Sequence, residues 1–140
     1  MRLSVFTDYG LRVLMRLAYD PQATLTTSGI ADELHIPYNH LTKVVQDLAR
    51  VGFVRTQRGA GGGIRLGRAP QSITLGEVVR LLEQRYAKVE CFRSDGGACL
   101  LTPNCRFKQK LAAAEEIFIA ELDKTTLAEC AHPGPSLTRR

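Results

Sequence analysis

Apolar residues near the start of the chain recur at every third or fourth position. Within residues 4–19 they are Val5, Phe6, Tyr9, Val13, Leu14 and Leu17. A spacing close to 3.6 residues places them on one face of an α-helix. Pro21 stands just beyond this segment and cannot continue a helix. We therefore predict an amphipathic helix over residues 4–19.

Two further helical patterns follow a polar stretch. Residues 29–36 predict a short helix that Thr27 or Ser28 would cap, with a turn at Pro37. Residues 38–52 again carry apolar side chains at helical spacing, namely Leu41, Val44, Val45, Leu48 and Val51. Two helices joined by a tight turn are typical of the helix-turn-helix motif, whose second helix contacts base edges in DNA. An ordinary helical hairpin would give the same pattern.

The pattern changes to a hairpin after residue 52. Residues 53–57 and 64–68 are predicted to form two strands, which the glycine-rich stretch RGAGGG at 58–63 joins. A basic hairpin after a helix-turn-helix is a winged helix, in which glycines let the backbone approach a phosphate or the minor groove. A nucleotide-binding phosphate loop is the alternative, but it would end in GKS or GKT, which this stretch lacks.

Two more helices complete the pattern. Residues 73–84 predict a helix that begins with a capping box between Thr74 and Glu77. The last helix is predicted to begin after Thr102, with Cys105 in its first turn, and to continue to about residue 129. Its apolar stripe consists of Phe107, Leu111, Ala114, Phe118, Leu122 and Thr125.

At a rise of 1.5 Å per residue, the predicted helix from Cys105 to about residue 129 is about 36 Å long, and the stripe occupies about 27 Å of it. A domain this small has little core left to cover such a stripe. We therefore predict that it packs against a second copy of the chain in a two-fold homodimer, although packing within the chain could cover part of it.

Length and composition fit a mostly helical protein with a small β-hairpin. The 140 residues are 44% hydrophobic, which suffices for an ordinary core. We predict a winged helix-turn-helix DNA-binding domain in residues 1–84, a cysteine-bearing loop and dimerisation helix in residues 85–129, and a disordered tail in residues 130–140. Charged residues interrupt the N-terminal apolar pattern, so we expect a cytoplasmic protein with no membrane partner.

Positive charge is concentrated in one segment. The chain has a net charge of +5, and residues 48–76 contain five arginines and no acidic residue. Such a stripe suits a polyanion, because phosphates that it neutralises release their counterions. A basic face that is simply solvated is the alternative. Together with the winged helix, the charge favours double-stranded DNA as the partner.

The helix-turn-helix interpretation selects the candidate DNA contacts. Tyr38, Asn39, His40 and Lys43 stand at the start of the second helix and are candidates for base or phosphate contacts. Candidates for backbone or minor-groove contacts are Arg12, Ser28, Arg58, Gly59, Gly61 and Gly62. His40 could instead cap its helix, and Tyr38 could instead pack against the domain.

Three cysteines, Cys91, Cys99 and Cys105, lie within fifteen residues, and Cys130 is the only other one. In a reducing compartment, clustered thiols are metal ligands or redox sensors more often than disulfides. The spacing contains no C-x2-C pair, which weakens a zinc site, whereas three thiolates on a glycine-containing loop suit an iron–sulfur cluster. An inert buried cysteine, a zinc site with one further ligand, and a thiol switch remain open.

These motifs together resemble the family of winged-helix transcriptional regulators that carry an iron–sulfur cluster, over about residues 1–129. The resemblance is carried by FTDYGLRVL at 6–14, the helix-turn-helix at 28–51, RGAGGGIRLG at 58–67, ITLGEVVRLLE at 73–83 and the three cysteines. The nitric-oxide-sensing members are the closer match, through YNHLTKV at 38–44, TPNCRFKQ at 102–109 and ELDKTTLA at 121–128. The seven residues between Cys91 and Cys99 form a longer gap than is common in relatives.

The resemblance implies a 4Fe–4S cluster, or a 2Fe–2S cluster as the second possibility. Its implied ligands are Cys91, Cys99, Cys105 and, from the opposite subunit, Asp8. The residues alone favour a solvated or helix-stabilising role for Asp8 and leave Cys130 as a rival ligand. The resemblance further implies a repressor that binds a pseudo-palindromic operator and leaves it when nitric oxide attacks or removes the cluster.

Two alternatives within the resemblance remain. Members that regulate iron–sulfur homeostasis use a histidine soon after the third cysteine as a ligand, but here the chain continues with Arg106, Phe107 and Lys108. A regulator switched by zinc or thiol oxidation is the other alternative. We predict no enzymatic activity, because the three histidines are scattered and no GxSxG or HExxH motif occurs.

Overall fold

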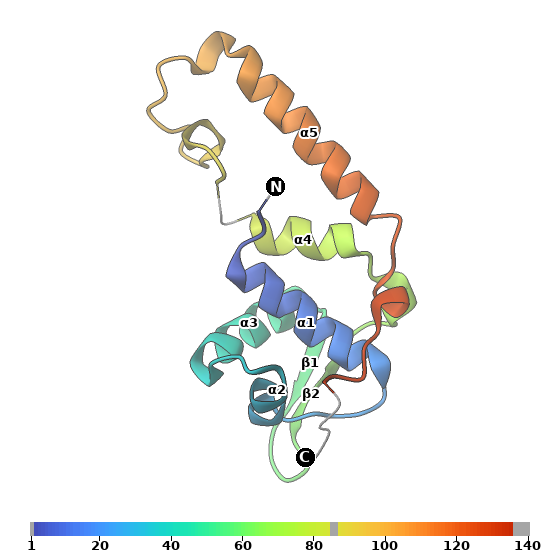
Figure 1. Cartoon of the computed structure of the whole chain (residues 1–140). Helices are drawn as coiled ribbons and strands as arrows, with labels where there is room; N and C mark the ends of the chain where they lie inside the picture. The colour runs from blue at the N-terminus through green and yellow to red at the C-terminus, as the bar shows by residue number, and fades with distance from the viewer. Residues whose placement is uncertain (1, 85–86, 136–140) are drawn as a thin grey trace.

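The structure, a computed structural model, describes residues 2–84 and 87–135, and the statements below refer to these residues (Figure 1). Its helices and strands are α1 (Val5–Tyr19), α2 (Thr27–Leu34), α3 (Tyr38–Arg50), β1 (Val54–Gln57), β2 (Gly63–Leu66), α4 (Leu75–Glu83) and α5 (Arg106–Leu122). Short 3₁₀ turns occur at Pro70–Ser72, Glu90–Phe92, Thr102–Asn104 and Leu127–Cys130. The predicted class, mostly helical with one small hairpin, is confirmed. No helix in the described ranges is both long and apolar enough to span a membrane.

The helix-turn-helix consists of α2 and α3. Thr26 caps α2, because its hydroxyl oxygen accepts a hydrogen bond from the Gly29 N–H at 3.0 Å, so the predicted cap at Thr27 or Ser28 is wrong by one or two residues. The chain leaves α2 through His35, which adopts the left-handed conformation with φ of 53°. Ile36 then enters the core and Pro37 precedes α3. The predicted turn between the two helices is confirmed.

The wing is an antiparallel hairpin in which Val54 pairs with Leu66 and Gln57 pairs with Gly63. Its inner face buries Val54, Ile64 and Leu66. At the tip, Gly59 and Gly61 have φ of 90° and 72°, which other residues rarely adopt. Leu25, which the sequence left in a polar linker, exchanges two backbone hydrogen bonds with Ile64, at 2.9 and 2.7 Å, and holds the wing to the loop before α2.

The hydrophobic core lies between α1, α2, α3, α4 and the inner face of the wing. Its most completely buried large side chains include Leu14, Leu17, Ile30, Leu41, Leu48, Phe53, Ile64, Ile73 and Leu127. Each contributes about 1.5–3 kcal/mol through removal of apolar surface from water. Leu127 lies beyond α5, so the core also draws on chain outside the segment predicted to form the DNA-binding domain.

The last helix is shorter than the sequence predicted. It ends at Leu122, so the predicted continuation to about residue 129 is wrong. The chain turns instead, and the Leu127 N–H donates to the Ile73 carbonyl at 2.8 Å while the Thr125 carbonyl accepts from Leu75 N–H at 3.0 Å. Burial of Leu127 in the core provides the physical reason for the turn, since further helix would carry it into solvent.

The segment after Cys130 lies along α1. The His132 N–H donates to the Met15 carbonyl at 3.0 Å, and Gly134 is buried beside the Glu33 carboxylate. The sequence predicted disorder from residue 130, but these contacts hold the backbone against α1 as far as residue 134. The rest of that prediction, residues 136–140, lies outside the described residues.

Candidate DNA-binding surface and cysteine loop

The start of α3 exposes polar side chains over a buried apolar face. Tyr38, Asn39, His40 and Lys43 are all exposed, with Tyr38 at 55%. The buried residues of the same helix are Leu41, Val44, Val45 and Leu48. The apolar face therefore anchors α3 to the core and leaves the opposite side of its first turns free to meet a ligand.

Two competing roles for these residues are tested by the geometry. No side chain forms a capping hydrogen bond at the start of α3, so His40 does not cap it. The His40 ring instead lies beside Tyr9 of α1, with 6.5 Å between ring centroids. Tyr38 is too exposed to be a core residue. Both side chains thus remain available at the surface.

The wing tip and α2 supply the other candidate contacts. Arg58, Gly59 and Gly61 are exposed, whereas Gly62 is partly buried, with its N–H donating to the Gly59 carbonyl at 2.9 Å. Ser28 is exposed in the first turn of α2. Figure 1 shows α2, α3 and the wing tip at the end of the molecule opposite to α5. The candidate contacts on these three elements therefore lie toward the same end of the molecule.

The basic stripe is partly neutralised by acids from outside its own segment. Arg50 pairs with Asp47 at 3.2 Å, and Arg68 pairs with Glu77 at 2.7 Å. Within the described residues, no salt bridge involves Arg55, Arg58 or Arg65. Within this stripe, the positive charge that has no acidic partner therefore lies on the wing.

Asp8 and Arg12 form an ion pair one helical turn apart on α1. Arg12 Nη2 lies 2.8 Å from Asp8 Oδ2, and Arg12 Nε donates to Asp8 Oδ1 at 3.2 Å. Both side chains are about half exposed, at 52% for Arg12 and 46% for Asp8. The pair holds the two side chains together on the surface of the first turns of α1.

The cysteine loop, residues 87–105, connects α4 to α5. Cys91 lies in a 3₁₀ turn, Cys99 lies in irregular chain, and Cys105 immediately precedes α5. The predicted position of Cys105 inside the first helical turn is wrong, because its sulfur instead caps the helix by accepting from the Lys108 N–H at 3.4 Å. All four cysteines of the chain are free thiols of intermediate burial.

The described residues contain no group of three His, Cys, Asp or Glu side chains close enough to hold a metal ion. The single chain therefore does not bring the three loop cysteines together, and Asp8 does not join them. The donor chemistry nevertheless fits an iron–sulfur cluster, for which cysteine thiolates are the usual ligands. Thr102, between Cys99 and Cys105, also has a buried hydroxyl with no hydrogen-bond partner in the described chain, so the loop contains a donor available to a bound group.

Glu83 links the helix before the cysteine loop to the helix that carries Asp8, and the sequence did not predict this role. Its carboxylate accepts from the Ser4 N–H at 2.9 Å and from the Ser4 hydroxyl at 2.7 Å, which joins the end of α4 to the start of α1. Burial raises the pKa of Glu83, but hydrogen bonds from Thr7 and Ser4 lower it by more, so the net pKa lies below its ordinary value. The sequence signal for this role is the position of Glu83 one turn after Val79, which places an acidic residue on the apolar face of α4.

Comparison with known proteins agrees with the motifs. The Rrf2 family model, described as an iron-dependent transcriptional regulator, matches residues 3–133. A protein of Bacillus subtilis (strain 168) named HTH-type transcriptional regulator NsrR is 44% identical over 130 residues, covering 92% of this chain and 89% of that protein. The motifs resemble regulators of the NsrR type within this family, and that resemblance is confirmed.

Solved structures agree with the fold. CymR, the global cysteine regulator of B. subtilis, superposes with a TM-score of 0.73 at 28% identity, covering 94% of this chain and 96% of that chain. T. potens IscR superposes with a TM-score of 0.72 at 23% identity over 92% of this chain and 85% of that chain, which is a likeness of fold. The predicted winged-helix class is confirmed by these neighbours.

Proposed function

Because the chain belongs to the Rrf2 family, whose members are DNA-binding transcriptional regulators and not enzymes, we propose that it is a homodimeric repressor that senses nitric oxide. The sensor would be an iron–sulfur cluster, 4Fe–4S in its native state. The observation that carries this proposal is the set of three free thiols in the cysteine loop of a chain so similar to NsrR proteins.

DNA would meet the surface formed by α3 and the wing. Asn39 and Lys43 have the amide and ammonium groups that recognise adenine and guanine edges, and Lys43 can equally bind a phosphate. Arg58 and the exposed backbone at Gly59 and Gly61 suit a phosphate or the minor groove. Ser28 and Arg12 would contribute backbone contacts beside them.

The second copy of the chain would cover α5. Within the chain only Ile119 of this helix is buried, and Phe107 remains 64% exposed. A groove of about 750 Å³ runs beside Phe107, Leu111, Ala114 and Phe118. Repetition of this apolar face in an identical chain gives a self-complementary two-fold contact, and a two-fold dimer matches a pseudo-palindromic operator.

Cys91, Cys99 and Cys105 of one protomer and Asp8 of its partner would hold the cluster. When bound, it supplies iron that reacts with nitric oxide, and an oxygen ligand binds iron more weakly than a thiolate does. Asp8 stands in α1, which packs against α3 through the core, so a ligand bond at Asp8 would link the dimer region to the recognition helix. Loss of that link would lower the population of the DNA-binding arrangement by about 5-fold to 150-fold.

Anaerobic purification tests the proposal. We expect a coloured protein that contains iron and sulfide, whose visible spectrum collapses on addition of nitric oxide as DNA binding is lost. Asp8→Ala and Cys99→Ala should each weaken operator binding, while the matched Cys130→Ala variant should bind as the wild type does. A colourless protein whose DNA binding ignores nitric oxide would contradict the proposal.

A thiol-based or zinc-based switch is the second candidate. The likeness to CymR, a cysteine regulator, and the four free thiols favour it specifically. It predicts iron-free protein whose operator binding changes on oxidation or on zinc removal. The third possibility, a regulator of iron–sulfur homeostasis, shares the cluster but predicts that DNA binding follows cluster occupancy and not nitric oxide in particular.

A further inference from the structure

The beginning of α4 is fastened to the end of α5. The Thr74 hydroxyl donates to Asp123 Oδ1 at 2.7 Å, and Arg80 Nη2 donates to Asp123 Oδ2 at 2.9 Å. At Gly76 the two helices touch directly, because an added Cβ would lie 2.6 Å from the Ile119 carbonyl oxygen. The crossing of α4 and α5 is therefore fixed by close packing and by a doubly bonded carboxylate.

The same turn of α4 is fastened to the base of the wing. Arg68 follows β2 closely, and its guanidinium binds both oxygens of Glu77, with N–O distances of 2.7 and 3.3 Å. It also donates to the Ser72 carbonyl at 2.6 Å and lies over the ring of the buried Phe53, 5.9 Å from the centroid. Phe53 directly precedes β1. Arg68, which itself follows β2, therefore contacts the chain where β1 begins.

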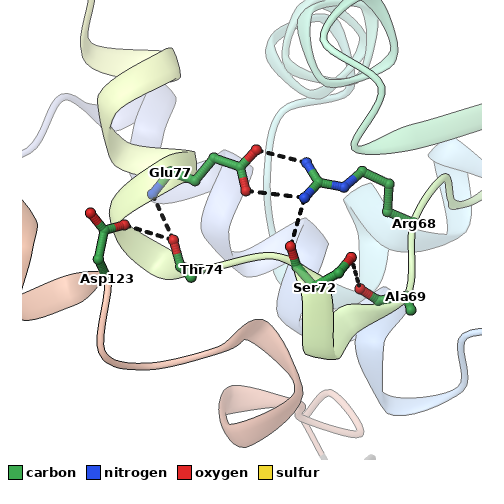
Figure 2. A network of polar contacts seen from close by, with 6 residues as sticks. All are labelled: Arg68, Ala69, Ser72, Thr74, Glu77 and Asp123. Atoms are coloured by element: carbon green, nitrogen blue, oxygen red, sulfur yellow. Dashed lines mark hydrogen bonds and ion pairs between the residues drawn. The ribbon is translucent and has the colours of Figure 1, made fainter.

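One continuous network results, from the wing to the end of α5, and we call Arg68, Thr74, Glu77 and Asp123 the junction network (Figure 2). Thr74 joins its two halves, since the hydroxyl that donates to Asp123 also accepts from the Glu77 N–H at 3.1 Å. The sequence predicted a capping box in which Glu77 would turn back to Thr74. The structure forms only half of it, because the Glu77 carboxylate is directed to Arg68.

We propose that the junction network sets the angle of the wing relative to α5, which makes its four members positioning residues for DNA binding. A wing can enter DNA only when its tip is aimed correctly. Leu25 and the buried inner face hold the hairpin to the core, and the junction network adds a link from its base to α5. Bidentate and charge-assisted bonds give the most geometrically specific support available to side chains. In the homodimer of the proposed function, the same angle would set the spacing of the two wings.

A double-mutant cycle tests this role. Arg68→Lys keeps the positive charge but loses the bidentate fork, and Asp123→Asn removes one negative charge. The two residues are linked only through Thr74 and Glu77, so independent effects on DNA affinity would multiply within about twofold. The probe is a DNA duplex that the wild type selects from a random library. We expect each single variant to bind this duplex at least about fivefold more weakly than the wild type does. The double variant should bind it no more weakly than the worse single variant.

Charge supplies an internal control. Asp123→Asn makes the chain more basic, so long-range attraction alone would leave DNA binding equal or tighter, whereas the positioning role predicts weaker binding. Glu121→Gln makes the same charge change two residues away, on a side chain 71% exposed and paired only with Lys124 in the described chain. It should not weaken binding, and its cycle with Arg68→Lys should be multiplicative.

Unfolding in urea identifies the variants that are fully folded at the assay temperature, and DNA affinity is compared only among these. A loss of affinity then cannot result from unfolding. If Asp123→Asn is too unstable, Thr74→Val enters the same cycle, since it removes the bonds of the hydroxyl to Asp123 and to the Glu77 N–H without changing charge. Multiplicative effects of Arg68→Lys and Asp123→Asn, or tighter binding by Asp123→Asn, would overturn the proposal. Each variant is compared with the wild type in the oligomeric state that the protein has. If the protein were not a dimer, that alone would produce neither multiplicative effects nor tighter binding by Asp123→Asn.

Discussion

Glu83 shows how one buried carboxylate can hold two elements of the site in register. It is 8% exposed, and its hydrogen bonds to Ser4 fix the start of α1, the helix that carries Asp8. A buried charge is costly unless it is fully hydrogen-bonded, and here each of these bonds is charge-assisted. Its neutral replacement should therefore weaken the contact between α4 and α1 without changing the fold.

We predict that Glu83→Gln lowers the free energy of unfolding by about 1–3 kcal/mol near pH 7. The net pKa of Glu83 is lowered by its hydrogen bonds, although burial acts in the opposite direction. A lowered folded-state pKa contributes stability above the ordinary value of 4.5, and this contribution is lost as the pH falls through the folded-state pKa. Urea unfolding across this range should show a steeper acid decline for the wild type than for the variant.

Asp32→Asn is the matched control, because Asp32 is exposed on α2. Its unfolding free energy should follow the wild type at every pH. A Glu83→Gln variant that retains the acid decline of the wild type in full would contradict a stabilising role for the ionised carboxylate.

Lys43 and Asn39 should affect DNA binding in different ways. Both are exposed at the start of α3, and a lysine that binds phosphate contributes to the salt dependence of affinity. If Lys43 binds phosphate, Lys43→Gln should reduce the slope of log K against log salt by about 0.9 and weaken all sequences alike. Asn39→Ala should leave the slope unchanged and relax discrimination at one base pair by about 1–3 kcal/mol. Binding titrations at several salt concentrations check both, and interchanged outcomes would reverse the two roles.

At the scale of elements, the sequence is most informative where a periodic apolar face meets a core. The apolar face of α3 is buried as predicted, and the glycine-rich hairpin forms the wing. The predicted face of α1 is buried at Val13, Leu14 and Leu17, whereas Val5 at its start is 57% exposed. The end of α5 could not be predicted because the helical spacing continues through Thr125, while the competing attraction of Leu127 to the core depends on tertiary packing. The pairing of Leu25 with Ile64 involves a single residue and leaves no periodic signal.

In the candidate site too, the placement of some residues follows from helical spacing and that of others does not. Exposure of Tyr38, Asn39 and Lys43 follows from their position on a helix whose other face is apolar, so it could be predicted. The Asp8–Arg12 pair follows from four-residue spacing. The geometry of Cys91 and Cys99 does not, because irregular chain has no repeat from which to calculate a distance.

The exposed face of α5 leads to a prediction about association. Leu111 lines the apolar groove, and a charged side chain there would have to be desolvated in the proposed dimer contact. We predict that Leu111→Asp shifts the protein from dimer to monomer in sedimentation experiments, with the helical content of the chain retained. Ala113→Asp places the same charge at an exposed position that does not line this groove and should leave the dimer intact. Persistence of the dimer in Leu111→Asp would exclude this face as the contact.

For the whole molecule, three regions with different roles are joined by short polar and apolar contacts. The candidate DNA contacts on α2, α3 and the wing lie at the surface, the thiols lie in the cysteine loop, and α5 carries the apolar face left open by the single chain. Glu83 connects the base of the cysteine loop to α1, and the junction network connects α5 to the wing. In the proposed dimer, a change at the thiols or at the α5 contact would reach the candidate DNA-binding surface through packed and hydrogen-bonded neighbours.

Mixed dimers test most directly whether the ligands of one cluster come from both protomers. Asp8→Ala and Cys99→Ala chains carrying different tags are combined, the heterodimer is isolated and loaded anaerobically, and its operator affinity is compared with that of each parent homodimer. With ligands shared across the dimer, the heterodimer retains one site with all four ligands, so it should bind more tightly than either parent and lose this advantage on exposure to nitric oxide. A heterodimer that binds no better than the stronger parent would contradict a shared ligand set.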